Sequence, residues 1–460
     1  MWKGCGQVSL YVFAQNDTAY RAMEQIHAQM EQSDRERMRV IVVPYQTNTV
    51  YRLLYEEPLY ECLSPDPNAE EALRVVIVGS DAWAEELYRA IYWCGQMPHK
   101  QLSIISLSED AEQFERRIRF LIPELDSVDN ERPYCISRFL SCRADTSDLD
   151  ELLRSEHLSE AGIWYVCMGD GQKNLEIASH LKSRLSALQI QRPRKTVIHF
   201  QLENDHLKQA LNQANREGDL YQMHAFASAL EQYSSRSFHS ELHTYARALH
   251  SAWENRLGVR NSVNEYNRRS SYASAVHLPY RLYAFGLLPQ RASSTSEAVR
   301  LGLENYRSQP DFQRRHEYAI GWMEHRRWNA YMRALGYRKV SIADWRAYYD
   351  TEEGKKRRQA EQRIDTKDHL RKLHTCLTEY LPQSAVPEGF LEHLGAGWQE
   401  SPLVTRLMEE GRLDELDALS VAIYRMGQGL KSRGDDIKHY DADPIEKAAA
   451  VKLHAERDTR

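Results

Sequence analysis

Aromatic and charged side chains alternate in the segment HEYAIGWMEHRRWNAYMRALGY, residues 316–337. Its pattern predicts one helix that begins after QPD, with Asp311 as the cap, and ends at Gly336. Side chains three and four residues apart project together from a helix. Six residues therefore share one broad face: Ile320, Glu324, Arg327, Trp328, Tyr331 and Leu335.

Two interpretations of this face remain open on spacing alone. An aromatic stripe at helical spacing is typical of a core, in which Glu324 with Arg327 or Trp328 forms a buried polar brace. Alternatively, rings beside guanidinium groups form a pocket for a planar, phosphate-bearing ligand, through stacking and charge-assisted hydrogen bonds.

The segment NEYNRRSSYASAVHLPYRLYAFGL, residues 264–287, places positive charge beside hydroxyl groups. Such a set suits a phosphate group, although arginine clusters are as often surface or interdomain salt bridges. The charged residues are Arg268, Arg269, His277 and Arg281.

A second candidate site follows the strand-like run RVVIVG, where a dinucleotide-binding domain carries its glycines. Gly79 keeps the first glycine of that fingerprint, and Ser80 follows it. Asp81 replaces the middle glycine, and Trp83 lies just beyond. The Asp81 carboxylate would lie where an anion binds, or it would cap the helix itself in place of a phosphate.

An acidic residue after the second strand would bind ribose hydroxyls, and Glu109 follows the strand LSIISL, 30 residues after Gly79. An NAD-dependent enzyme at this turn would also need an acid or base. His99 and His199 are the only candidates. No Ser-His-Asp, metal-ligand or P-loop pattern with suitable spacing occurs in the sequence.

Strand-like and helix-like segments alternate to about residue 215, which predicts an α/β domain with a parallel sheet. The pattern of residues 10–30 repeats in residues 164–184. We therefore interpret residues 1–73 as the last two βα units of a first Rossmann-like lobe whose front half precedes this chain, and residues 74–215 as a second lobe. Alternatively, strands 8–14 and 38–45 extend the edge of the main sheet.

Beyond residue 205 the segments are helix-like, so the second half is predicted to be mostly α-helical. We expect a helical linker over 216–261, a helical domain over 262–385 and a helical extension over 386–460. The charged run 350–372 predicts a solvated helix or a loop.

Composition excludes several classes of protein. The net charge of −6 gives no overall attraction to nucleic acid or to anionic membranes. The seven cysteines form no CxxC pair, which favours a reduced, cytoplasmic protein. No apolar run reaches the roughly 18 residues that span a bilayer, so we expect no membrane segment in this chain. A membrane segment upstream of it or in a partner protein stays an open alternative.

Residues 74–215 resemble the TrkA-N type of Rossmann domain, the regulatory domain of bacterial potassium transporters and channels. The resemblance depends on strand order and on MGDGQKNLEIA, which is similar to that family's acidic turn followed by an asparagine, here Asp170 and Asn174. It implies a domain that binds NAD(H) or another adenine nucleotide and forms homodimers without catalysing a reaction.

Residues 262–385 resemble the RyR domain, named from ryanodine receptors and also present in bacterial proteins. The helix pattern E-H-x-R-W followed by G-[WY] matches Glu324, His325, Arg327, Trp328, Gly336 and Tyr337. KLHTCLTEYLP supplies His374 and Leu377, with Thr375 where proline is usual. A preceding segment of bacterial RyR proteins matches Asn267, Arg268, Ser270, Ser271, Ala275, His277 and Arg281.

Together the resemblances imply a non-enzymatic regulator that responds to a nucleotide-derived ligand, with an output in ion transport or phage defence. The ligand would act by binding one arrangement of the two halves better than another. The alternatives are an NAD-dependent enzyme at Gly79 and a scaffold whose pockets are vestigial.

Overall fold

A computed structural model describes residues 8–14, 19, 22–23, 38–129, 132–144, 147–155, 158–188, 196–215, 219–233, 240–257, 265–360, 367–375, 377, 406 and 409–410. The expected helical extension over 386–460 lies outside the described residues, except for these last three positions.

The first half of the chain is built on one parallel sheet. Its strands are β3 (Glu71–Val78), β4 (Lys100–Ser108), β7 (Ile136–Ser141), β8 (Ile163–Val166), β9 (Thr196–Gln201) and β10 (Tyr221–Phe226). They are ordered β10-β9-β8-β3-β4-β7, and every neighbouring pair is parallel. Numbered along the chain, this is the order 6-5-4-1-2-3 of a doubly wound, Rossmann-like fold.

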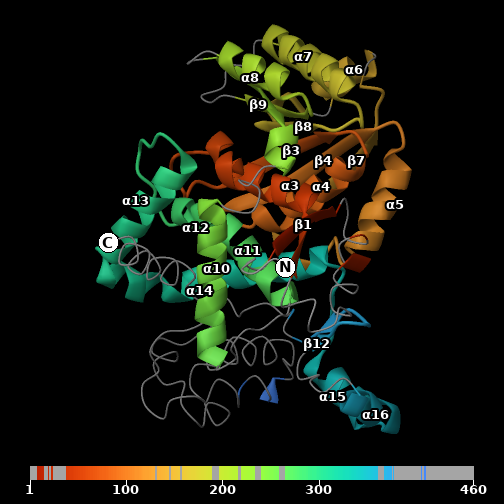
Figure 1. Ribbon diagram of the computed structural model, residues 1–460, viewed down its shortest axis with the longest axis vertical. Coiled ribbons are helices and arrows are strands. Elements are labelled where there is room, and N and C mark those ends of the chain that lie inside the picture. Colours follow the sequence, from red (N-terminus) through yellow and green to blue (C-terminus); the bar gives the residue numbers. More distant parts are fainter. Residues whose placement is uncertain are drawn as a thin grey trace, which may run out of the picture.

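Helices cover both faces of this sheet because its strands are apolar on both sides (Figure 1). Val76 and Val78 face α6 (Ser147–Ser155) and α7 (Gly171–Ala187), with α8 (Asp205–Ala214) beside them. Val75 and Ile77 face α3 (Tyr45–Glu56), α4 (Ala82–Cys94) and α5 (Ala111–Leu121). The second face is continuous with the core of the helical half.

Strand β10 falls in a region that the sequence predicts to be helical, so the linker expected over 216–261 is wrong for its first part. Tyr221, Met223 and Ala225 are buried on one face of this strand. The sheet therefore extends to residue 226, beyond the predicted domain boundary at 215. The helical half begins later, after α9 (Ala229–Tyr233).

The N-terminal segment forms its own pair of parallel strands, β1 (Val8–Ala14) and β2 (Met38–Pro44). In the described residues these strands do not join the six-stranded sheet, so the edge-addition interpretation is wrong. Helix α3 and the short helix η1 (Leu59–Cys62) lead from β2 to β3. The interpretation as half of a further lobe stays a prediction.

The second half is mostly helical, as predicted. It contains α10 (Glu241–Leu257), α11 (Glu265–Val276), α12 (Leu278–Ala284), α13 (Thr295–Arg307) and α14 (Pro310–Ala334). A small sheet of β11 (Arg338–Lys339), β13 (Leu373–His374) and β12 (Lys367–Asp368) follows, with α15 (Ile342–Asp350) and α16 (Glu352–Ala360) inserted (Figure 1).

The long helix predicted from the aromatic segment is confirmed, with one correction at its start. Pro310 occupies the first turn and Gln309 is the N-terminal flanking residue, so Asp311 is not the cap. Asp311 lies within the first turn, where its charge favours the helix dipole. Gly336 ends the helix with a φ of +84°, a conformation that glycine adopts without strain.

Helix α4 connects the two halves. It begins at the Gly79 turn, and its other end packs against α14. Arg89 Nε donates to the Ala334 carbonyl at 3.1 Å, and the Trp93 ring meets Tyr331 edge-on at 5.8 Å.

In the part of the chain that the structure describes, no helix combines the length and the apolar character needed to cross a bilayer.

Candidate functional sites

The Gly79 turn requires a glycine at its first position. Gly79 adopts a φ of +111°, and a Cβ atom there would lie 1.8 Å from the Cys167 carbonyl oxygen. The turn lies between the ends of β3 and β8, where the strand order reverses and such folds bind their ligands. Only glycine allows the two strand ends to come this close.

The anion position at this turn is filled by the protein. Asp81 Oδ1 accepts a hydrogen bond from the Ala84 N–H at 2.9 Å and caps α4. Burial raises the pKa of the Asp81 carboxyl, and hydrogen bonds from the backbone of Ala84, Trp83 and Gly169 oppose that rise. The second interpretation of Asp81, that it caps the helix in place of a phosphate, describes this geometry.

Neighbouring groups close the turn further. Ser80 Oγ donates to Asp110 Oδ1 at 2.6 Å, whereas the predicted ribose ligand Glu109 is exposed one residue earlier. The Ser80 carbonyl accepts from Arg117 at 2.7 Å. The Trp83 ring packs edge-on against Phe226 at 5.9 Å. The acidic side chain directed at the turn is thus Asp110.

Asp170 and Asn174 stabilise the next turn. Asp170 caps α7 by accepting from the Lys173 N–H at 2.8 Å. Asn174 is buried; its Oδ1 accepts from the Met168 N–H at 2.7 Å, and its amide donates to Gln201 at 3.0 Å. Asp170 therefore stabilises the start of α7, and Asn174 connects the segment after β8 to the end of β9.

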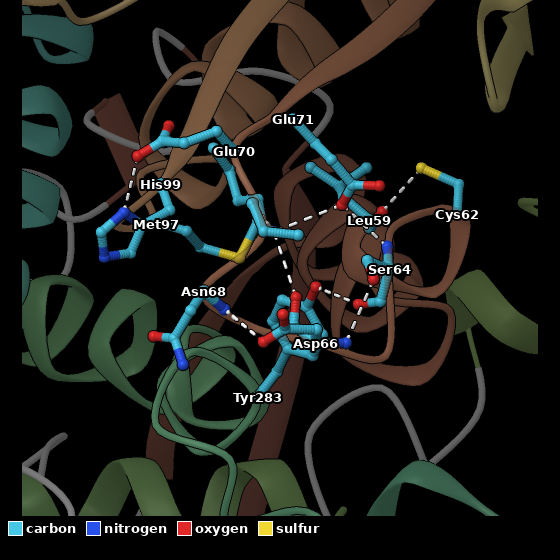
Figure 2. Close-up of polar contacts among 12 residues, drawn as sticks. Leu59, Cys62, Ser64, Asp66, Asn68, Glu70, Glu71, Met97, His99 and Tyr283 are labelled. Atoms are coloured by element: carbon cyan, nitrogen blue, oxygen red, sulfur yellow. Dashed lines mark hydrogen bonds and ion pairs between the residues drawn. The ribbon is translucent and has the colours of Figure 1, made fainter.

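The two histidines considered for an enzyme at this turn lie elsewhere. His99 precedes β4, at the end of the strands opposite to the Gly79 turn, and pairs with Glu70 at 2.7 Å (Figure 2). His199 lies within β9 beneath the N-terminal segment, with its ring stacked on Tyr165. The structure therefore brings neither ring to Gly79.

In the helical half, Glu324 lies at the centre of a buried ion cluster. Arg327 binds it in a bidentate manner, with both N···O distances 2.8 Å, and Arg281 contacts Glu324 Oε2. Ser274 Oγ donates to Glu324 Oε1 at 3.2 Å. Burial raises the pKa of Glu324, but Arg281 and Arg327 outweigh it and hold that pKa well below its usual value.

This cluster brings together predicted ligand-binding residues, but it turns them toward one another. Arg281 and Arg327 have 0% exposure. His277 is equally buried and stacks on Tyr280; burial, reinforced by Arg281 and Arg327, lowers its pKa well below the usual value. The polar-brace interpretation of the α14 face therefore describes this part of the helix.

Three other predicted residues lie on the first turns of α11. Arg268 is exposed there, while Asn267 and Arg269 are half-buried. The Asn267 carbonyl accepts from Ser271 Oγ at 3.1 Å, an ordinary bond within the helix.

The aromatic residues at the far end of α14 form a second group. His325 stacks on Trp328, and Trp328 meets His374 edge-on at 5.1 Å. The ring centres of His374 and Tyr337 lie 6.3 Å apart, whereas Tyr331 packs inward against Trp93. These buried rings support the small sheet that follows α14.

Next to them, two half-buried lysines contact the half-buried ring of Tyr266 and the buried ring of Tyr337. Lys367 Nζ lies 4.2 Å from the Tyr266 ring centre, and Lys372 Nζ lies 4.4 Å from that of Tyr337. The exposed His369 contacts the Tyr337 hydroxyl through Nδ1 and meets Tyr266 edge-on at 4.9 Å. Burial and the charges of Lys367 and Lys372 lower the pKa of His369 to about 4.

We call these five residues the lysine–tyrosine cluster. Sequence analysis named only Tyr337 among them. The others lie in segments separated by up to about a hundred residues, on α11 and around β12 and β13, and no single pattern contains them.

Comparison with known proteins adds no name to these sites: no family model, curated protein or solved structure matches the chain.

Proposed function

We propose that this protein is a non-enzymatic regulator that binds a nucleotide-derived ligand on its helical half, at the lysine–tyrosine cluster. The α/β half, of the TrkA-N kind, and the helical half, of the RyR kind, would act as one signalling unit. The observation that carries the proposal is the placement of two lysine ammonium groups over tyrosine rings beside an exposed histidine.

The chemistry of this cluster suits a nucleotide. Tyrosine faces stack on bases, and lysine ammonium groups bind phosphate oxygens as point charges. An exposed contact between a cation and a ring contributes only about 0.5–1 kcal/mol. Phosphate oxygens would approach the Lys367 and Lys372 ammonium groups, and the base would stack on the half-buried ring of Tyr266, because Tyr337 is only 1% exposed.

At the other two predicted sites, side chains of the protein itself contact the groups that would bind a ligand. Arg281 and Arg327 already share the Glu324 carboxylate, and Asp81 caps the helix at the Gly79 turn. The two arginines at Glu324 and the N-terminus of α4 at the Gly79 turn therefore already have partners within the protein. This leaves the lysine–tyrosine cluster as the best place for an anionic ligand in the described helical half.

A route for the signal runs through α14. Tyr337 follows the C-terminal end of that helix, and Tyr331 contacts Trp93 of α4 within it. A ligand that shifts the end of α14 would move the helix that begins at the Gly79 turn. Regulation would follow if the ligand binds one arrangement of these helices better than another.

The test is isothermal titration of the full chain with NAD, NADH, ATP, ADP-ribose and cyclic nucleotides. At least one of these should bind wild type. The double variant Lys367→Ala/Lys372→Ala should bind it at least about tenfold more weakly, since each charge-assisted contact contributes roughly 1.5–3 kcal/mol.

The matched control is Lys355→Ala, which removes an exposed lysine of α16 paired with Glu352. It should leave affinity unchanged. Equal weakening by the control variant would mean that the effect comes from net charge alone, and the proposed site would be wrong.

A further inference from the structure

Three side chains from distant parts of the sequence meet on the sheet face that α3 covers. Glu57 directly follows α3, whereas His199 and His224 are register partners on the neighbouring parallel strands β9 and β10. One carboxylate oxygen and one nitrogen of each ring all lie within 4.8 Å of one another. Glu57 Oε2 contacts His224 Nδ1 and lies 3.6 Å from His199 Nδ1.

The surroundings hold the two rings in fixed orientations. His199 is 2% exposed, and its ring stacks on Tyr165 with the ring centres 4.9 Å apart. His224 stands edge-on to His199, at 83° and 5.8 Å. The side chain of His224 is 22% exposed, so the group opens toward solvent on that side.

A small hollow adjoins the group. It has a volume of about 10 Å³ and is lined by Glu57, His199 and Cys62, among others. That is about the space that one water-sized particle needs. The hollow therefore has room beside these ligand atoms for a bound water, but not for an organic molecule.

Nearby charges do not oppose a cation there. Lys208 contacts Glu231, and Arg52 lies 3.8 Å from the same carboxylate. Both cations are thus partly neutralised by a neighbour, and the Glu57 carboxylate is available to balance an ion.

A simple histidine–carboxylate pair would need only two side chains. The chain contains such a pair in His99 and Glu70 (Figure 2). The group at Glu57 differs because a second histidine, almost fully buried, is aimed at the same carboxylate oxygen. Two imidazoles and one carboxylate form a donor set typical of zinc and related ions, whereas calcium and magnesium prefer oxygen alone.

We propose that Glu57, His199 and His224 bind one divalent transition-metal ion of the zinc type. Each ring would carry its proton on Nε2 and coordinate through Nδ1. A water in the adjoining hollow would provide a further ligand. The ion would join Glu57, which directly follows α3, to the outer strands β9 and β10 of the Rossmann-like sheet.

Cobalt(II) titration of the full chain, stripped of metal by a chelator, tests this site. Cobalt(II) bound by nitrogen and oxygen ligands absorbs visible light and is displaced by zinc. Wild type should bind one equivalent whose spectrum zinc removes. His224→Gln should lose this spectrum, and Glu57→Gln should weaken binding by at least about tenfold, as expected for loss of a ligand.

His99→Gln is the matched control, because it breaks a histidine–carboxylate pair that has no third ligand; it should bind like wild type. Zinc should raise the melting temperature of wild type and of His99→Gln, but not that of His224→Gln. Because His224 is partly exposed, we expect His224→Gln to fold. Far-ultraviolet circular dichroism checks this. Binding that is absent in wild type, or unchanged in His224→Gln, would overturn the proposal.

Discussion

Two pairs of cations in the helical half show opposite uses of positive charge. Arg281 and Arg327 are fully buried and share the Glu324 carboxylate. Lys367 and Lys372 lie near the surface against tyrosine rings. A buried cation needs an ion-pair or hydrogen-bond partner, because desolvation is otherwise too costly. Lys367 and Lys372 are only half-buried, so burial is the property that, in our proposal, distinguishes a binding cation from a structural one.

The Gly79 turn extends this comparison to the α/β half. The N-terminus of α4 could bind an anion at this turn, but the Asp81 carboxylate already accepts a hydrogen bond from its Ala84 N–H. In both halves, the residues that most resemble a ligand site in sequence are those that the fold uses for itself.

The largest expected effect is that of Glu324→Gln. This change leaves Arg281 and Arg327 without their shared carboxylate, and breaking a buried ion pair typically costs about 3–5 kcal/mol. Denaturant unfolding should therefore show a free energy of unfolding lower by that amount. A stability equal to wild type would show that the buried arginines do not depend on Glu324.

Glu304→Gln is the control for that experiment. Glu304 pairs with Arg300 on the surface of α13 at 3.1 Å, and both side chains are more than 40% exposed. Exposed helix pairs of this kind contribute about 0.3–0.5 kcal/mol.

A smaller but substantial loss of stability is expected for Gly79→Ala. The left-handed conformation at this position costs about 1–3 kcal/mol in other residues, and the new Cβ would overlap the Cys167 carbonyl. Gly169→Ala is the matched control, since Gly169 also has a positive φ but no atom lies within 4 Å of the added Cβ. Thermal unfolding should rank the two variants in that order; the reverse order would contradict the close approach of β3 and β8.

Removal of the helix cap in Asp81→Ala should lower the free energy of unfolding by about 1 kcal/mol. Asp81→Asn should retain most of this stability, because asparagine is an equally good cap. Chemical denaturation of both variants separates capping from charge. If asparagine proves as costly as alanine, the charge of Asp81 and not its cap supports the turn.

A further prediction concerns the titration of His369. The folded-state pKa of His369 is about 4, below the usual 6.5. As pH falls, the unfolded chain therefore binds a proton at this residue before the folded chain does. The free energy of unfolding decreases accordingly between pH 6.5 and 4. An anion bound by Lys367 and Lys372 should raise this pKa. Proton NMR of the His369 ring with and without a nucleotide that binds measures the shift; an unchanged midpoint would mean that the anion lies elsewhere.

Much of the fold could be predicted from local patterns. The run RVVIVG alternates with helix-like segments, so the parallel sheet was predictable, and helix α14 was predictable from its stripe of rings and charges. Strand β10 was missed because YQMHAF lies between two helix-like stretches, and its pairing with β9 supplies what local propensity does not.

The sites were less predictable, because burial and partners decide their roles. Arg327 and Glu324 are neighbours on one helix, so their pairing was an open alternative, but the second arginine reaches them from α12. Glu109 and Asp110 are equally acidic, and only the path of the turn selects Asp110. No spacing rule connects Glu57 with His199 and His224, which only the sheet brings together.

The central claim is that anionic ligands bind the lysine–tyrosine cluster and not the Gly79 turn. Titration of one nucleotide that binds wild type into Lys367→Ala/Lys372→Ala and into Asp81→Asn tests it most directly. The account predicts at least about tenfold weaker binding by the lysine variant and wild-type affinity for Asp81→Asn. Undiminished binding by the lysine variant, with affinity altered in Asp81→Asn, would contradict it and assign the ligand to the Rossmann-like turn.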